Sequence, residues 1–340
     1  MSHVLDQAAM KSDKPAVDRP ASAFRRLLAD NRAAVGTFVV FIAMMSVFMV
    51  ASPAVFMSWE IYNSVLVTLP VALCLAAPLV FVVTVGEIDL SFPATMGFSA
   101  WIFALLVHAG ANVVLAMLAA LATGTVLGLG VGALVVYASL SSLIATLGMN
   151  YMLRGLILIV TQGKSIALLE LRDSTAANLF AGDVFGLPVQ VLWALAFVVL
   201  AAMLFNRHRF GARVHVVGDN PDSAAQMGIN TGRVRVATFA FMGLGAALAG
   251  VFTTLVNFTW WPTTGDGYLL PAIASVFVGG TPTWGGIGTI AGGAIGALTV
   301  AFIQTGIVAS GLSGFYVQSF NGLIIVLALL GHRWNQKRYR

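Results

Sequence analysis

Long apolar stretches separated by short polar segments dominate the sequence from residue 33 onward. A helix that crosses a bilayer needs about 20 mostly apolar residues, so the pattern predicts an all-α integral membrane protein with about ten transmembrane helices, some broken or re-entrant. The segment Tyr268–Gly280 is short and interrupted, so a count of about eight stays open. The expected spans are Ala33–Ala51, Ile61–Val85, Pro93–Ala109, Asn112–Tyr137, Ser141–Thr161, Val189–Phe205, Val236–Phe258, Tyr268–Gly280, Thr289–Val308 and Phe315–Leu330.

The composition excludes an ordinary soluble protein. Such domains contain about 25% charged residues, whereas this chain has 9% charged and 59% hydrophobic residues. No Lys or Arg occurs between Arg32 and Arg154, or between Arg235 and Arg333. The net charge of +5 does not indicate nucleic-acid binding, because the basic residues flank apolar spans as the positive-inside rule expects. We therefore expect the lipid bilayer as the surroundings and no nucleic-acid partner.

Three basic clusters predict which ends of the spans face the cytoplasm. They are residues 1–32, the loop 206–235 and the tail 332–340. All three fall on one side if six spans precede residue 206 and four follow residue 235, as the apolar pattern indicates. The near-neutral loop 162–188 then lies outside. The predicted layout is a cytoplasmic N-terminal tail (1–32), a transmembrane domain (33–331) and a basic cytoplasmic C-terminal tail (332–340).

Acidic residues and glycine–proline breaks interrupt the apolar pattern in both halves. Gly86–Ser91 follows the second span, and Gly265–Gly267 and Gly279–Pro282 lie in the second half. Paired breaks point to a transport pathway built from discontinuous helices, although loops at the membrane surface explain the pattern equally well. The candidate pathway residues, polar or aromatic side chains at these breaks or within apolar runs, are Asn63, Glu87, Asp89, Ser91, Asn150, Thr281, Trp284 and Gln304.

Three other features have structural explanations. Arg154, inside the fifth span, either extends to the membrane surface or pairs with an acid such as Asp89. Trp260, Trp261 and Trp284 suit stacking on a sugar ring, but anchoring at the membrane surface is commoner for tryptophan. Glycines four residues apart predict close helix packing; they are Gly124, Gly128 and Gly132 in the first half and Gly288, Gly292 and Gly296 in the second.

Catalytic and nucleotide-binding motifs are missing from the sequence. No HExxH, GxSxG or GxxxxGK[ST] pattern occurs, so protease, hydrolase and NTPase chemistry is not indicated. The five histidines lack metal-ligand spacing, and the single cysteine, Cys74, can form neither a disulfide within the chain nor a thiolate metal site. We expect no catalytic residue, metal or cofactor in this chain, and a separate subunit to bind ATP if ATP drives it.

The loop 206–235 contains the signature of a short capped helix. Asn220 is a good N-cap, Pro221 suits the first helical position, and Asp222 is favourable near the N-terminus. Gly228 supplies the stop. Such a helix suits docking into a groove of a partner, although a simple tether explains it equally well. The candidate coupling residues are Asn220, Pro221, Asp222, Ala224, Ala225, Gln226, Met227, Gly228 and Ile229.

Four segments, in order, resemble the permease subunits of ribose-type sugar ABC importers. Gly86–Ser91 (GEIDLS) is similar to the family's GGIDLS, and Ser142–Met149 with Arg154–Leu156 to its PFIVTLGT…RGL. Gly218–Ile229 is similar to its cytoplasmic G-x-N-x-x-A-A-x-x-x-G-I loop, and Ala272–Thr289 to its AIAAVVIGGTSLSGGRGT segment. The resemblance extends from about residue 33 to 330.

The resemblance implies a non-catalytic translocation subunit of the bacterial inner membrane. It further implies pairing with a second permease copy or a paired permease, a cytoplasmic ATP-binding cassette ATPase carrying ATP and Mg²⁺, and a periplasmic sugar-binding protein. The 206–235 loop would contact the ATPase, and the solute would be a monosaccharide or polyol. Glu87 and Phe92-Pro93 replace usually small residues, and Leu269 and Pro271 stand where acids are common, so solute identity stays open.

Two other functions remain alternatives. One is a stand-alone secondary transporter in which Asp89 or Glu87 binds a coupling proton or cation. The other is a membrane-embedded enzyme, which the missing catalytic motifs disfavour. Uptake driven by a proton gradient, without ATP, would distinguish the secondary transporter from the ATP-driven permease.

Overall fold

The computed structural model describes residues 32–172, 174–184 and 186–338. Contacts divide the chain into Met1–Arg32 and Ala33–Arg340, and only the second unit is described below. The predicted N-terminal tail lies outside the described residues apart from Arg32, and so do the last two residues of the predicted C-terminal tail.

Helices form most of the described structure and strands almost none of it, which confirms the all-α prediction. Within the described ranges, eight helices are long and apolar enough to cross a membrane. Two shorter apolar helices, α5 (Phe92–His108) and α13 (Leu269–Val278), join them. The eight are α2 (Arg32–Ala51), α4 (Trp59–Thr84), α6 (Val113–Tyr137), α7 (Ser142–Thr161), α9 (Val189–Asn206), α12 (Thr231–Asn257), α14 (Ile290–Ala309) and α15 (Phe315–Arg338).

The two short helices adjoin the predicted breaks: α5 begins directly after Gly86–Ser91, and α13 lies between Gly265–Gly267 and Gly279–Pro282. At 1.5 Å per residue, α13 is about 15 Å long, half of the roughly 30 Å hydrocarbon core. Helix α13 is therefore too short to cross a membrane by itself. The remaining elements are short: α3 (Pro53–Phe56), β1 (Ile166–Ala167), η1 (Leu169–Leu171), α8 (Thr175–Ala181), β2 (Asp183–Val184), β3 (Leu187–Pro188), α10 (Arg209–Asp219), α11 (Pro221–Gln226) and β4 (Thr259–Trp260).

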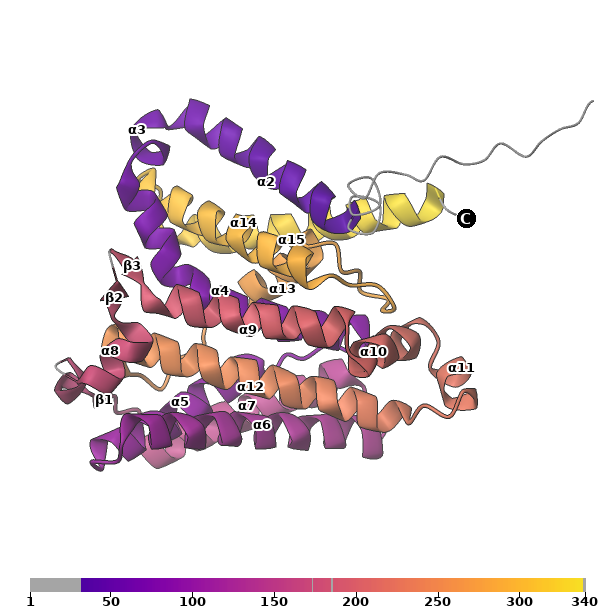
Figure 1. The fold of residues 1–340 in the computed structure, drawn as a ribbon, viewed down its shortest axis with the longest axis horizontal. Coiled ribbons are helices and arrows are strands. Elements are labelled where there is room, and N and C mark those ends of the chain that lie inside the picture. Colours follow the sequence, from indigo (N-terminus) through magenta and orange to yellow (C-terminus); the bar gives the residue numbers. More distant parts are fainter. Residues whose placement is uncertain (1–31, 173, 185, 339–340) are drawn as a thin grey trace, which may run out of the picture. The chain divides into compact units, whose positions relative to one another are not determined.

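The two ends of the helix bundle are named here the α11 end and the α8 end. Figure 1 shows α10 and α11 at the first, and α8 with the short strands at the second. Strand β1 pairs antiparallel with β4 at the α8 end. The polar loops 162–188 and 206–235 therefore lie at opposite ends of the helices, as the parity of the spans predicts.

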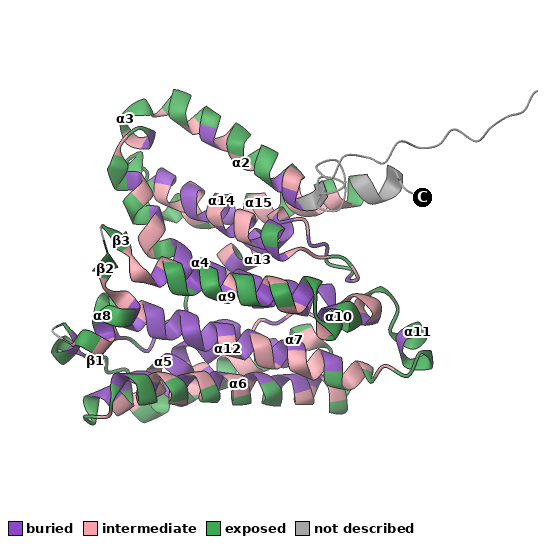
Figure 2. Cartoon of the chain, in the orientation of Figure 1, coloured by how far each residue is buried: buried purple, intermediate pink, exposed green. Residues whose placement is uncertain are grey.

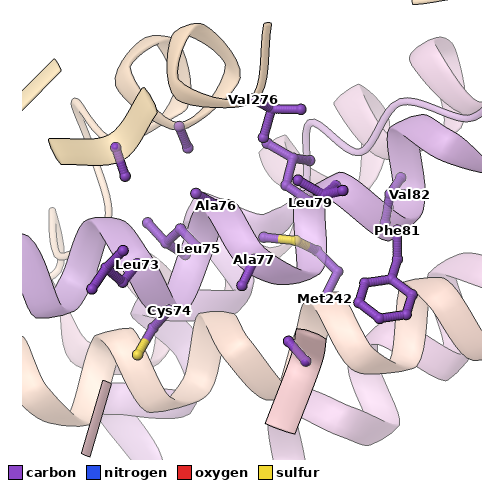
Figure 3. Packing of buried hydrophobic residues seen from close by; sticks show 14 of the residues in the cluster. Leu73, Cys74, Leu75, Ala76, Ala77, Leu79, Phe81, Val82, Met242 and Val276 are labelled. Atoms are coloured by element: carbon purple, nitrogen blue, oxygen red, sulfur yellow. The ribbon is translucent and has the colours of Figure 1, made fainter. Parts of the chain in front are cut away.

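Helix α4 forms the centre of the unit. Most of its side chains from Leu69 to Thr84 are buried, and it packs against α9, α12, α13 and α14. Figure 3 shows Leu75 and Leu79 among the side chains of the main core cluster, with Met242 and Val276 beside them. By contrast, the apolar side chains of α2 are largely exposed (Figure 2). An apolar surface of this kind requires lipid or another membrane protein around it.

The glycine rows serve helix packing, as predicted, except that Gly288 lies before α14 and is not on its helix face. A Cβ on Gly128 would overlap the Phe239 carbonyl oxygen, and one on Gly124 the Gly243 carbonyl, so α6 and α12 touch backbone to backbone. In the second row, a Cβ on Gly296 would overlap the Ser275 carbonyl oxygen of α13. Close backbone approach of this kind is how small residues join membrane helices.

The helix bounds differ from the predicted spans by more than two residues at two places. Helix α12 begins at Thr231, five residues before the predicted start, because the Asn230 side chain accepts from the Arg233 N–H and caps it. Helix α15 continues to Arg338, so the predicted basic tail is largely helical. Apolar content alone defines a span, whereas caps define where the helix itself begins and ends.

Candidate functional site

The first break joins α4 to α5 through residues 85–91. The chain leaves α4 at Gly86, whose φ of +90° suits glycine. The Glu87 carboxylate pairs with Arg235 at the start of α12, at 3.4 Å. The Asp89 carboxylate accepts from both the N–H and the hydroxyl of Ser91, at 2.7 and 2.6 Å. Both acids predicted as pathway candidates are therefore engaged by neighbouring protein groups.

The second break consists of the non-helical residues on both sides of α13, 261–268 and 279–289. Arg154 of α7 holds the first of these two stretches. The guanidinium donates to the carbonyl oxygens of Pro262 and Thr264, at 2.8 and 2.9 Å. It also pairs with Asp266 at 2.6 Å. Arg154 therefore pairs with an acid, as one of the two alternatives predicts, but the acid is Asp266 and not Asp89. Asp89 is occupied by Ser91, and the acid that reaches Arg154 comes from the other half of the chain.

Trp260 is a core residue, and the proposed stacking on a sugar is wrong for it. Its side chain is 0% exposed, and its Nε1–H donates to the Gly97 carbonyl oxygen at 3.0 Å. This bond ties the second break to α5. Sequence position beside a break could not distinguish a buried tryptophan from an exposed one.

Helix α10, which was not predicted, connects the 206–235 loop to both breaks. Its apolar residues Phe210, Val214 and Val217 recur at helical spacing, and the two valines are buried. At its end, a Cβ on Gly218 would overlap the Thr84 carbonyl oxygen and lie 2.7 Å from the Gly286 nitrogen. Gly218 therefore allows α10 to touch the end of α4 and the second break at once.

Two further hydrogen bonds complete this junction at the α11 end. The Gly286 N–H donates to the Thr84 carbonyl oxygen at 2.8 Å. The His215 Nδ1 lies 2.9 Å from the Gly286 carbonyl oxygen, and because a carbonyl only accepts, Nδ1 carries the hydrogen. The end of α4, residues 285–286 and the end of α10 thus form one connected group.

Helix α11 is built as its sequence predicts and presents an exposed face. The Asn220 side chain accepts from the Ser223 N–H at 2.9 Å, and Pro221 occupies the first turn. Ala224 is fully buried, whereas Met227 is 64% exposed. Gly228, with φ of +77°, ends the turn. The other coupling candidates Asp222, Ala225 and Gln226 are exposed, and Ile229 is half-buried.

The remaining pathway candidates do not form one cluster. Thr281 is buried and Trp284 exposed in the segment that contacts α10, at the α11 end. Gln304 lies about 20 Å along α14 from the start of that helix at Ile290. Asn63 is exposed on the first turns of α4. Asn150 lies on α7, one turn before Arg154. The structure brings together Glu87, Asp89 and Ser91 only because they are neighbours in the sequence.

Comparisons with known proteins agree with this architecture. The family described as branched-chain amino acid transport system permease component matches residues 61–329. The ribose import permease RbsC of Escherichia coli K12 is 30% identical over 298 residues, 86% of this chain and 92% of that protein. The chain belongs to this permease family. RbsC of Bacillus subtilis 168 is 34% identical over 258 residues, covering 75% and 79%. The D-allose permease AlsC of E. coli K12 is 31% identical over 296 residues, covering 87% and 88%.

No solved structure gives a significant match to this permease. Family membership confirms the resemblance seen in the four sequence segments. Together with the apolar helices, it identifies the permease as a multi-pass protein of the bacterial inner membrane.

Sequence reasoning missed the residues that join the loop to the breaks. They are Thr84, His215, Gly218 and Gly286. The apolar spacing of residues 210, 214 and 217 was the available signal for α10. The contact of α10 with residues 285–286, far along the chain, had no signal in a single sequence.

Proposed function

We propose that this permease is the translocation subunit of an ATP-binding cassette importer for a monosaccharide or polyol. One observation carries the proposal. The exposed helix α11 continues from α10, and α10 touches the ends of both helix breaks through Gly218 and His215. A partner that grips α11 therefore acts on both breaks through a short, rigid connection.

Energy enters in this proposal through a separate cytoplasmic ATPase. ATP and Mg²⁺ bind on that subunit, and closure of two such subunits pulls on α11 and shifts α10. Because Gly218 of α10 meets Thr84 and Gly286 backbone to backbone, this contact contains no flexible side chain that could absorb the movement. The breaks then open toward one side and close toward the other. An extracytoplasmic binding protein supplies the solute, and a second permease completes the pore.

The state of the acidic residues favours an uncharged solute. Glu87 pairs with Arg235, Asp89 accepts from Ser91, and Asp266 pairs with Arg154. A coupling ion or a charged solute would need a free fixed charge, whereas two of these carboxylates are paired with arginines and the third is held in hydrogen bonds to Ser91. The relatives are named for ribose and D-allose, which are uncharged hydroxylated sugars. This agrees with a neutral sugar and disfavours the secondary transporter.

Reconstitution tests the proposed function directly. Proteoliposomes would contain the permease, the cassette ATPase and the binding protein of the same bacterium, with radiolabelled D-ribose and D-allose as probes. We expect uptake that requires ATP and the binding protein and does not respond to a proton gradient. Uptake by the permease alone, driven by the gradient, would establish the secondary transporter instead.

A variant of α11 tests the docking role. Ala225→Glu places a charge on the exposed face of α11, where no internal contact is lost. We expect the chain to insert normally but to lose the ATPase during co-purification. The matched control is Thr175→Glu at an exposed position of α8 at the other end, which should retain the ATPase. Equal retention by both variants would contradict docking at α11.

A further inference from the structure

A row of polar residues lies along one face of α7, facing the first break. Residues four apart on a helix share a face, so these side chains form a ladder with a step of about 6 Å. We name this row the positioning strip; its members are Ser142, Thr146, Asn150 and Arg154.

The first two members hold the unwound backbone of the first break. The Ile88 N–H donates to Ser142 Oγ at 3.2 Å, and the Leu90 N–H donates to Thr146 Oγ1 at 3.0 Å. Thr146 is fully buried. A continuous helix would satisfy these N–H groups internally, but an unwound segment at membrane depth needs other acceptors. Two residues of extended chain advance about 6.6 Å, close to the step of about 6 Å between strip residues on α7. Every second N–H of the first break therefore lies opposite one strip residue.

Asn150 has no donor opposite it because the extended segment has already ended. The Ser91 N–H donates to Asp89, and α5 begins at Phe92. In the described part of the chain, the buried Asn150 Oδ1 has no hydrogen-bond partner. Ser142 and Thr146 therefore hold the first break, and Asn150 separates these two residues from Arg154.

The last member of the strip reaches both breaks. Arg154 Nη2 lies 3.3 Å from the Pro93 carbonyl oxygen, just after the first break. The same guanidinium donates to the Pro262 and Thr264 carbonyl oxygens and pairs with Asp266 in the second half. The fork of an arginine suits several acceptors at once, unlike the single ammonium of lysine.

Two glycines leave the room that this junction requires. A Cβ on Gly97 would lie 3.0 Å from Arg154 Nη1, and one on Gly265 would lie 3.2 Å from Nη2. The Cβ on Gly265 would also overlap the Pro93 carbonyl oxygen. The two breaks and Arg154 therefore meet with no side chain between them.

We propose that the positioning strip fixes both breaks to α7, so that they move as one unit when the permease changes conformation. Ser142 and Thr146 position the first break, and Arg154 joins it to the second. This inference rests on the proposed transport function for its purpose, although its physical content does not depend on ATP. At the α11 end, α10 moves the joined breaks through Gly218. Toward the α8 end, α7 holds the two breaks together through Arg154.

Hydrogen–deuterium exchange of the purified permease tests the strip without any partner. Thr146→Val keeps the shape of the side chain and removes the acceptor for the Leu90 N–H. We expect exchange across residues 86–92 to accelerate about tenfold or more, and Thr146→Ser to restore it. The control is Thr161→Val on the same helix, because the Thr161 hydroxyl donates only to Ile157 within α7. Equal exchange in Thr146→Val and Thr161→Val would overturn the proposal.

A second variant tests whether the breaks are joined. Arg154→Lys keeps the charge opposite Asp266 but cannot bridge the carbonyl oxygens of both breaks. We expect faster exchange in residues 86–93 and in residues 258–268 together. Acceleration confined to 258–268 would show that the breaks are independent and would contradict the proposal.

Transport measurements separate a positioning role from simple stability. In the reconstituted system, Thr146→Val should hydrolyse ATP at nearly the wild-type rate while D-ribose uptake per ATP falls about tenfold. ATP hydrolysis and uptake that fall in parallel with folded yield would indicate a merely structural role. If the wild-type permease shows no ATP-driven uptake but the exchange results hold, the proposed function fails and the strip stands.

Discussion

Replacing Gly218 by alanine should lower ATP-driven sugar uptake about 5- to 150-fold, the range of a 1–3 kcal/mol loss of coupling, while the chain still inserts and still binds its ATPase. The cause is steric. The added methyl group would overlap the Thr84 carbonyl oxygen and approach the Gly286 nitrogen, and both are backbone atoms that cannot rotate away. Overpacking of this kind typically costs about 1–3 kcal/mol. The end of α10 has to lift away from both breaks to relieve it.

A matched glycine distinguishes this effect from a general effect of alanine. Gly130 of α6 is exposed, and no atom lies within 4 Å of the position that a Cβ would take. Alanine there should leave uptake unchanged and raise helix stability by roughly 0.5–1 kcal/mol. Uptake and ATPase co-purification are measured for both variants. Gly218→Ala uptake within twofold of wild type would show that the α10 junction does not transmit the movement.

Asp89 should tolerate loss of its charge but not loss of its hydrogen-bonding oxygen. The residue is 3% exposed, and its carboxylate accepts from the N–H and hydroxyl of Ser91. Asp89→Asn keeps a carbonyl oxygen for these donors, so uptake should fall by less than about tenfold. Asp89→Leu leaves both donors buried without a partner, at a cost of about 1–3 kcal/mol each. We expect that variant to lose folded yield and uptake together.

These two variants also decide between the ATP-driven importer and the secondary transporter. A residue that carries a coupling proton must titrate, and asparagine does not. A well-folded Asp89→Asn variant with no uptake would therefore favour the secondary transporter. Folded yield is measured by size-exclusion chromatography of detergent-solubilised protein, and uptake in the reconstituted system. Glu87→Gln serves as the second carboxylate control, because Glu87 is held by Arg235 and is expected to behave similarly.

Local signals in the sequence predicted the helices and the cap of α11. Apolar length defines a span, and the Asn220-Pro221 pair defines a helix start, without reference to any distant residue. The glycine rows predicted close packing for the same reason. In each case the physical cause lies within a few residues of the feature itself, so one sequence is sufficient to identify it.

Contacts between distant segments could not be predicted in this way. Arg154 lies 112 residues before Asp266, and nothing in the sequence favours that acid over Asp89. Trp260 is buried because distant segments, β1 and α5 among them, cover it. The scattered pathway candidates show the same limit, since polarity within an apolar run does not indicate which neighbours the side chain meets. Residues such as Gly218 gain their importance from the backbone that they touch.

The side of the membrane on which α11 lies tests ATP-driven coupling most directly, because a cytoplasmic ATPase can bind only a helix that faces the cytoplasm. The single native cysteine, Cys74, is fully buried, so single-cysteine labelling has little background. Asp222→Cys and Asp183→Cys place exposed thiols at the α11 end and the α8 end. With a membrane-impermeant maleimide, we expect Asp222→Cys to react only in inside-out vesicles and Asp183→Cys only in intact spheroplasts. The reverse pattern would place α11 outside the cell and contradict ATP-driven coupling through it.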